Sequence, residues 1–87
     1  MSDASRRLYN SVNNMLNGLK LMSDRRPDAK IGTAATTFNA VLRATKQELR
    51  SSGLIQEVRE LSDHDTVVAL VAGLAVLQAE LGDTLYG

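Results

Sequence analysis

The sequence predicts an all-α fold: a small compact bundle of about four mostly antiparallel helices, three long and one short. Apolar residues recur at spacings of three and four along most of the chain. No segment shows the sustained alternation of apolar and polar residues that a half-buried strand requires. The 87 residues suffice for a single domain, residues 1–87, with one modest core.

The first helix is expected from Asp3 to Met22, with Ser2 or Asp3 as its cap. Its apolar residues lie four, three, four and three apart, as on one face of a helix: Leu8, Val12, Met15, Leu19 and Met22. Residues 23–28 form a turn, because Pro27 cannot continue this helix. The apolar face should meet the core of the domain.

The second helix has two candidate starts. Pro27 suits the first turn of a helix and is the preferred start, with Thr33 as the alternative. Weak helix formers around Gly32 also allow a break there. Residues 51–53, Ser-Ser-Gly, end this helix, and a third helix of about two turns follows over residues 54–61.

The fourth helix is predicted to start at Ser62 and to end at Gly82. Ser62 and Asp65 have the spacing of a capping box, and Gly82 is a natural terminator that leaves residues 82–87 as a tail. Residues 67–77 contain no charged or strongly polar side chain, so this helix is apolar nearly all round. Such a helix should be covered on more than one side.

A helical wheel divides this last helix into a bulky side and a side of small residues. The small side chains, which let another helix backbone come close, are candidate self-association residues: Ala69, Ala72, Gly73 and Val76. The helix that they admit belongs either to the same chain or to a second copy. With the second alternative, the chain is expected to have a protein partner, which includes a second copy of itself.

Charge is unevenly divided, although the whole chain is neutral. Residues 1–50 carry nine basic and four acidic residues, a net charge of +5, and residues 51–87 carry one basic and six acidic residues, a net charge of −5. The two halves can attract each other within one fold or head to tail between chains. A basic half can also indicate nucleic-acid binding.

Amide and basic side chains gather on the polar side of the first helix and in the turn after it. The residues concerned are Arg6, Asn10, Asn13, Asn17, Lys20, Arg25 and Arg26. Amide and guanidinium groups on one helix face can contact phosphates and base edges. A solvated face is the simpler interpretation, and a protein-partner surface or a nucleic-acid surface are the functional ones.

The sequence offers no catalytic, cofactor-binding or metal site. His64 is the single histidine, cysteine is absent, and neither nucleophile-elbow nor phosphate-loop motifs occur. The absence of cysteine fits a cytoplasmic protein, and stability must come from packing or oligomerisation. The longest apolar run, residues 67–77, falls short of the roughly 20 residues that span a bilayer, so no membrane contact is expected.

These observations predict a non-catalytic protein–protein interaction module, such as an adaptor, a regulatory subunit or a bacterial or phage accessory protein. It is expected to self-associate through its fourth helix. One alternative is a nucleic-acid-binding accessory protein that uses the basic N-terminal half. Another is an adaptor domain similar to the death fold, whose length this chain matches but whose architecture requires six helices.

Overall fold

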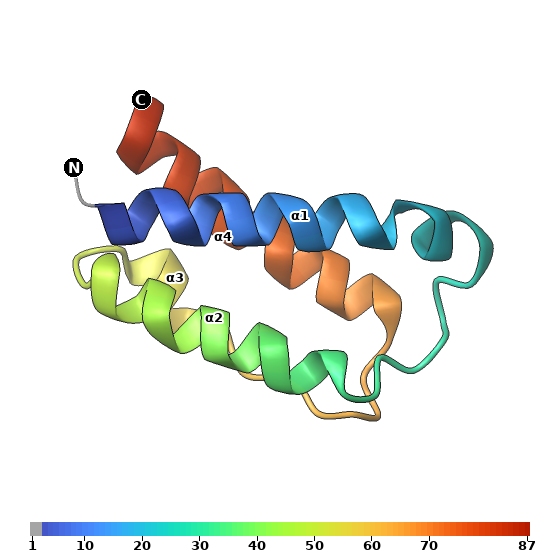
Figure 1. Ribbon diagram of the computed structural model, residues 1–87. Coiled ribbons are helices and arrows are strands. Elements are labelled where there is room, and N and C mark those ends of the chain that lie inside the picture. Colours follow the sequence, from blue (N-terminus) through green and yellow to red (C-terminus); the bar gives the residue numbers. More distant parts are fainter. Residues whose placement is uncertain (1–2) are drawn as a thin grey trace.

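The computed structural model describes residues 3–87 and confirms the all-α bundle (Figure 1). Its helices are α1 (Asp3–Arg25), α2 (Ala34–Glu48), α3 (Gly53–Glu57) and α4 (Val67–Tyr86). Both α2 and α4 run antiparallel to α1 (Figure 1). The one β-type pairing in residues 3–87 is an isolated bridge between Lys30 and Thr66.

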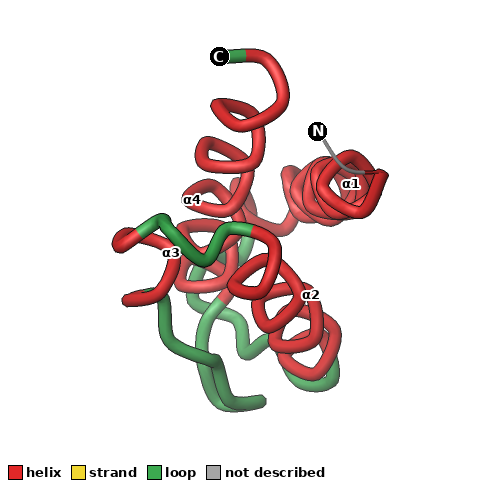
Figure 2. The backbone as a smooth tube through the Cα atoms, turned by 90° about the vertical axis from the view of Figure 1, so that its left-hand side faces the viewer, coloured by secondary structure: helices red, strands yellow, loops and turns green. Residues whose placement is uncertain are grey.

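The core is built around α4, which contacts the other three helices and most extensively α1. Its buried leucines at positions 70, 74, 77 and 81 meet Val12 of α1, Phe38 and Leu42 of α2, and Ile55 of α3. The predicted apolar face of α1 turns toward this core from Leu8 to Leu19, with Val12 fully buried, but Met22 at its end is 42% exposed and lies outside the core. Figure 2 shows α1, α2 and α4 around the core, with α3 on the side away from α1.

The first helix runs one turn further than predicted, to Arg25. The N–H of Arg26 still donates to the carbonyl of Met22, at 2.6 Å, so the helical hydrogen bonds continue up to the residue before Pro27. Proline then ends the pattern, because it lacks an N–H. Ser2, one of the two expected caps, lies outside the described residues.

Helix α2 begins at Ala34, so the preferred, earlier start is wrong and the alternative just after Gly32 is nearly right. The backbone before it is bonded elsewhere. Ile31 donates its N–H to the carbonyl of Asp65, at 2.9 Å, and Gly32 donates to that of Asp63, at 3.1 Å. Gly32 turns the chain with a φ of +58°, a conformation that glycine adopts without strain.

Helix α3 is shorter than expected and ends at Glu57. Ser52 caps it, because the Ser52 hydroxyl accepts a hydrogen bond from the N–H of Ile55 at 3.3 Å. The chain then becomes extended and is held by Asn39 of α2, whose side-chain amide bonds to the backbone of Leu61. Residues 58–61 therefore leave the predicted helix to pair with a side chain.

The predicted start of α4 at Ser62 is also wrong. Ser62 and Asp65 do interact, since the N–H of Ser62 donates to the Asp65 carboxylate at 2.7 Å, but His64 donates to the Ser62 hydroxyl and closes a local turn. The helix starts at Val67, and Thr66 is its cap. The Thr66 hydroxyl accepts from the N–H of Ala69 at 3.3 Å.

The loop between α1 and α2 completes this helix start. The N–H of Val67 donates to the carbonyl of Ala29 at 2.9 Å, and the N–H of Val68 donates to that of Pro27 at 3.0 Å. First-turn N–H groups have no partner within their own helix. Here two of them are satisfied by a segment that lies about 40 residues earlier in the chain.

Gly82 does not end α4, and the predicted tail is helical up to Tyr86. Leu85 is buried, and the ring of Tyr86 meets that of Tyr9 edge to face, with 5.6 Å between centroids. These tertiary contacts outweigh the weak helix preference of glycine. With 20 residues, α4 is long and apolar enough to cross a bilayer by length and composition, a test that the core helix of a bundle also passes.

Candidate interaction surface

The side of α4 that faces away from the core is exposed and apolar. We call it the outer face of α4 and define it by its exposed residues Val68, Ala72, Ala75 and Ala79, which lie four, three and four apart. Val68 is 54% exposed. Asp83, also exposed, continues the same row one turn later. Surface helices usually present polar side chains here, so this face is unusual.

The structure separates the four residues expected to mediate self-association. Gly73 faces the ring of Phe38 in the same chain so closely that an added Cβ would lie 2.8 Å from Phe38 Cζ. Ala69 and Val76 are half-buried, and Val76 packs against the core. Ala72 alone is exposed. The small-residue side is thus partly filled by α2, and only its Ala72 edge faces solvent.

Val68 and Ala75, like Ala79, belong to the outer face but were not among the four predicted residues. A spacing of four and three from Ala72 places both on its side of the helix, and this signal is present in the sequence. The sequence does not reveal that Phe38 approaches from the Gly73 side. That approach shifts the exposed face around the helix toward α1.

A groove of about 350 Å³ runs between α4 and α1 beside the outer face. Its lining residues are Leu16, Asn17, Lys20, Ser23, Asp24, Val71, Ala75 and Gln78. Gln78 donates to the side-chain oxygen of Asn13 at 2.6 Å, which ties the two helices together on this flank. The groove therefore joins an apolar wall on α4 to a polar wall on α1.

Six of the seven amide and basic residues singled out in the sequence are exposed: Arg6, Asn10, Asn17, Lys20, Arg25 and Arg26. Asn13 is half-buried and bonded to Gln78. Spacings of four and three place residues 6–20 along one flank of α1, whereas Arg25 and Arg26 lie at its end. Asp24 shares the groove with Lys20, so this flank carries both signs of charge.

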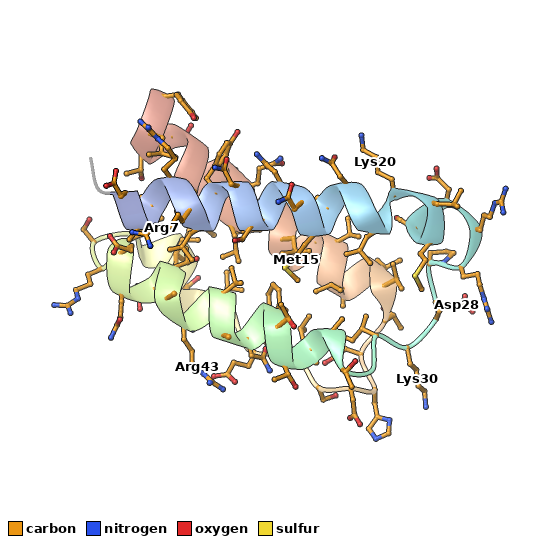
Figure 3. All side chains as sticks on the ribbon, viewed as in Figure 1. Arg7, Met15, Lys20, Asp28, Lys30 and Arg43 are labelled. Carbon is orange, nitrogen blue, oxygen red and sulfur yellow. The ribbon has the colours of Figure 1, made fainter. Side chains whose placement is uncertain are left out.

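Two further hollows lie between α1 and α2, one toward each end, and we call them together the α1–α2 trough. The first, of about 270 Å³, is lined chiefly by Met15, Gly18, Leu19, Ala34, Thr37 and Leu70. The second, of about 280 Å³, is lined by Ala4, Arg7, Leu8, Ala44, Gln47 and Glu48. Figure 3 shows Met15 directed from α1 toward α2 and Lys20 directed away from α2. The trough and the α1–α4 groove therefore occupy different flanks of α1.

One ion pair fixes the extended segment to α2. Arg43 Nη2 lies 2.8 Å from Glu60 Oε1, and Arg43 Nε donates to Oε2 at 3.1 Å, so the pair is bidentate. Hydrogen bonding from Arg43 lowers the pKa of Glu60, and the same bond raises the pKa of Arg43. Both groups are exposed, so the pair links the extended segment to α2 at the surface of the molecule.

The chemistry of the described residues is sparse. His64 is exposed in the loop before α4, with Nε2 3.6 Å from a carboxylate oxygen of Asp63. Within residues 3–87, no three His, Asp or Glu side chains are grouped so as to hold a metal ion. Comparison with protein-family models, curated proteins and solved structures found no match to this chain.

Proposed function

We propose that this chain is a small non-catalytic interaction module, an adaptor or regulatory subunit, that self-associates through the outer face of α4. The observation that carries the proposal is the exposed apolar row Val68, Ala72, Ala75 and Ala79 on the helix that also forms the core. Burying that row against a partner removes apolar surface from water.

A second copy of the chain is the simplest partner. Most soluble oligomers are built from identical subunits. The outer face combines small side chains with Val68, so a partner helix can approach closely and still gain an apolar contact. The α1–α4 groove beside it supplies amide and charged groups for a polar rim, as interfaces usually have.

Nucleic-acid binding is the second candidate, supported by the exposure of Arg6, Lys20, Arg25 and Arg26. Phosphate contacts by such residues make binding weaken steeply with salt. The Arg25→Glu/Arg26→Glu variant would then lose salt-sensitive retention of duplex or single-stranded DNA. The death-fold alternative requires six helices, whereas residues 3–87 form four.

Light scattering coupled to size exclusion tests self-association directly. The wild-type chain is expected to show a mass that rises with concentration up to high micromolar levels, and Ala72→Glu is expected to remain a monomer. Thr36→Glu, an equivalent change at an exposed position of α2, is the control and should associate like the wild type. A wild-type chain that stays monomeric throughout would contradict the proposal.

A further inference from the structure

We propose that the outer face of α4 in one copy docks into the α1–α2 trough of the next, so that copies associate head to tail. The inference rests on the proposed function and specifies its geometry. Both surfaces lie on every copy, the outer face on α4 and the trough between α1 and α2. One copy therefore presents the outer face and the trough at the same time.

The walls of the trough allow a helix to come close. A Cβ added at Gly18 would meet no heavy atom within 4 Å, and Ala34 and Thr37 form the opposite wall of the same hollow. Small residues on both sides suit the close packing of a third helix. Met15, with its flexible side chain, can adapt its shape to the side chain that enters.

Charge favours this pairing over one between two copies of α4. Packing α4 against α4 brings together two helices that each carry −2, from Glu80 and Asp83, whereas head-to-tail docking places α4 on α1 and α2, which carry +2 and +1. A specific pair is available. Arg7 lines the trough, Asp83 continues the outer face, and neither forms an ion pair within residues 3–87.

The lengths of the two surfaces agree when α4 of the incoming copy lies antiparallel to α1. From Val68 to Asp83 a helix rises about 22 Å, and from Arg7 to Gly18 it rises about 16 Å. The extended arginine side chain covers the difference. Asp83 then reaches Arg7 while Val68 enters the hollow beside Met15 and Gly18. Arg7 also lies at the negative end of the incoming helix, where a cation is stabilising.

Such pairing leaves a free outer face at one end of the assembly and a free trough at the other. Contacts between unlike surfaces close into rings or extend as filaments, whereas contacts between like surfaces stop at a dimer. The wild-type chain should therefore form species larger than a dimer as its concentration rises.

A complementation experiment distinguishes the two geometries. Ala72→Glu blocks the outer face of α4, and Gly18→Leu fills the trough at a position where the folded chain has room. Each variant alone is expected to be monomeric, and an equimolar mixture is expected to form a one-to-one dimer that grows no further. Gly18→Ala, which adds a single methyl group at the same place, is the control and should assemble like the wild type.

A second trough variant and a measurement of helix content guard against an effect of Gly18→Leu on α1 itself. Thr37→Arg fills the trough from α2, and circular dichroism of each variant verifies that its helix content is unchanged.

The substitutions Arg7→Glu and Asp83→Arg should each weaken association by at least about ten-fold. Their combination in one chain should restore association.

The outcomes are separable. If Gly18→Leu and Thr37→Arg associate like the wild type while Ala72→Glu is monomeric and not rescued by mixing, α4 pairs with α4, and the head-to-tail inference is overturned while the proposed function stands. A monomeric wild-type chain overturns the proposed function, and this inference with it. Rescue in the mixture supports both.

Discussion

The side-chain amide of Asn39 in α2 makes two hydrogen bonds of 2.8 Å with the backbone of Leu61, donating to the carbonyl and accepting from the N–H. This is the pattern by which one strand pairs with another, made here by a side chain. It holds the residues after α3 in an extended conformation alongside α2. The short third helix is therefore explained by a residue on another helix.

Replacing Asn39 with alanine should be costly. The change leaves a half-buried N–H and carbonyl of Leu61 without their partners, which should lower the free energy of unfolding by about 1–3 kcal/mol. Urea denaturation followed by circular dichroism measures it. Asn10→Ala, at an exposed position of α1, is the control. A loss at Asn39 no larger than that at Asn10 would show that the pairing is dispensable.

A larger residue at Gly73, which lies close to Phe38, should destabilise the core. Gly73→Ala places a methyl carbon 2.8 Å from the ring, and the overpacking should cost about 1–3 kcal/mol. Gly18→Ala, where space is free, should instead stabilise α1 by up to about 1 kcal/mol. The opposite signs are measurable by thermal unfolding. Phe38→Leu should relieve part of the penalty at Gly73 in a double-mutant cycle, and equal effects of the two glycine changes would refute the packing argument.

The position of the α4 cap can be tested by a pair of matched substitutions. Thr66→Ala removes the hydroxyl that accepts from Ala69 and should cost about 1 kcal/mol of stability. Ser62→Ala removes only a hydroxyl of an exposed turn and should cost less than about 0.5 kcal/mol. Both values follow from denaturant unfolding. The reverse order would place the functional cap at Ser62.

The ion pair between Arg43 and Glu60 should make stability depend on pH. Its hydrogen bond lowers the pKa of Glu60 in the folded state below the ordinary value of 4.5. The pair therefore adds stability above pH 4.5, and this gain disappears as the pH falls through the folded pKa. Glu60→Gln should be less stable than the wild type at pH 7, and the difference should vanish in strong acid. Glu57→Gln is the control, and an unchanged difference in acid would contradict the assignment.

The sequence predicted the all-α class and the core-facing seam of α1 because both follow from the 3.6-residue period of apolar positions. It failed at boundaries that tertiary contacts decide. The backbone before α2 bonds to the loop before α4, Asn39 interrupts the third helix, and Leu85 carries α4 past Gly82. At each boundary the local sequence favours one end point for the helix, and contacts with other parts of the fold move it.

The candidate interaction surface shows the same division. The wheel position of Ala72 predicts its exposure, whereas Gly73 is covered by Phe38 of α2, a residue 35 positions earlier in the chain. The trough was not predictable, since it is a space between two helices and not a property of either. Periodicity identifies the faces of a helix, and packing determines which of them remain exposed.

The hydrogen bonds from Val67 and Val68 to the α1–α2 loop have a consequence for the order of folding. The Thr66 cap is local, since its partner Ala69 is three residues away, but the bonds from Val67 and Val68 need a loop closure of about 40 residues, which is slower. The first two N–H groups of α4 therefore gain these partners only after the α1–α2 loop has docked. A fragment that lacks residues 1–48 would leave those two N–H groups to water.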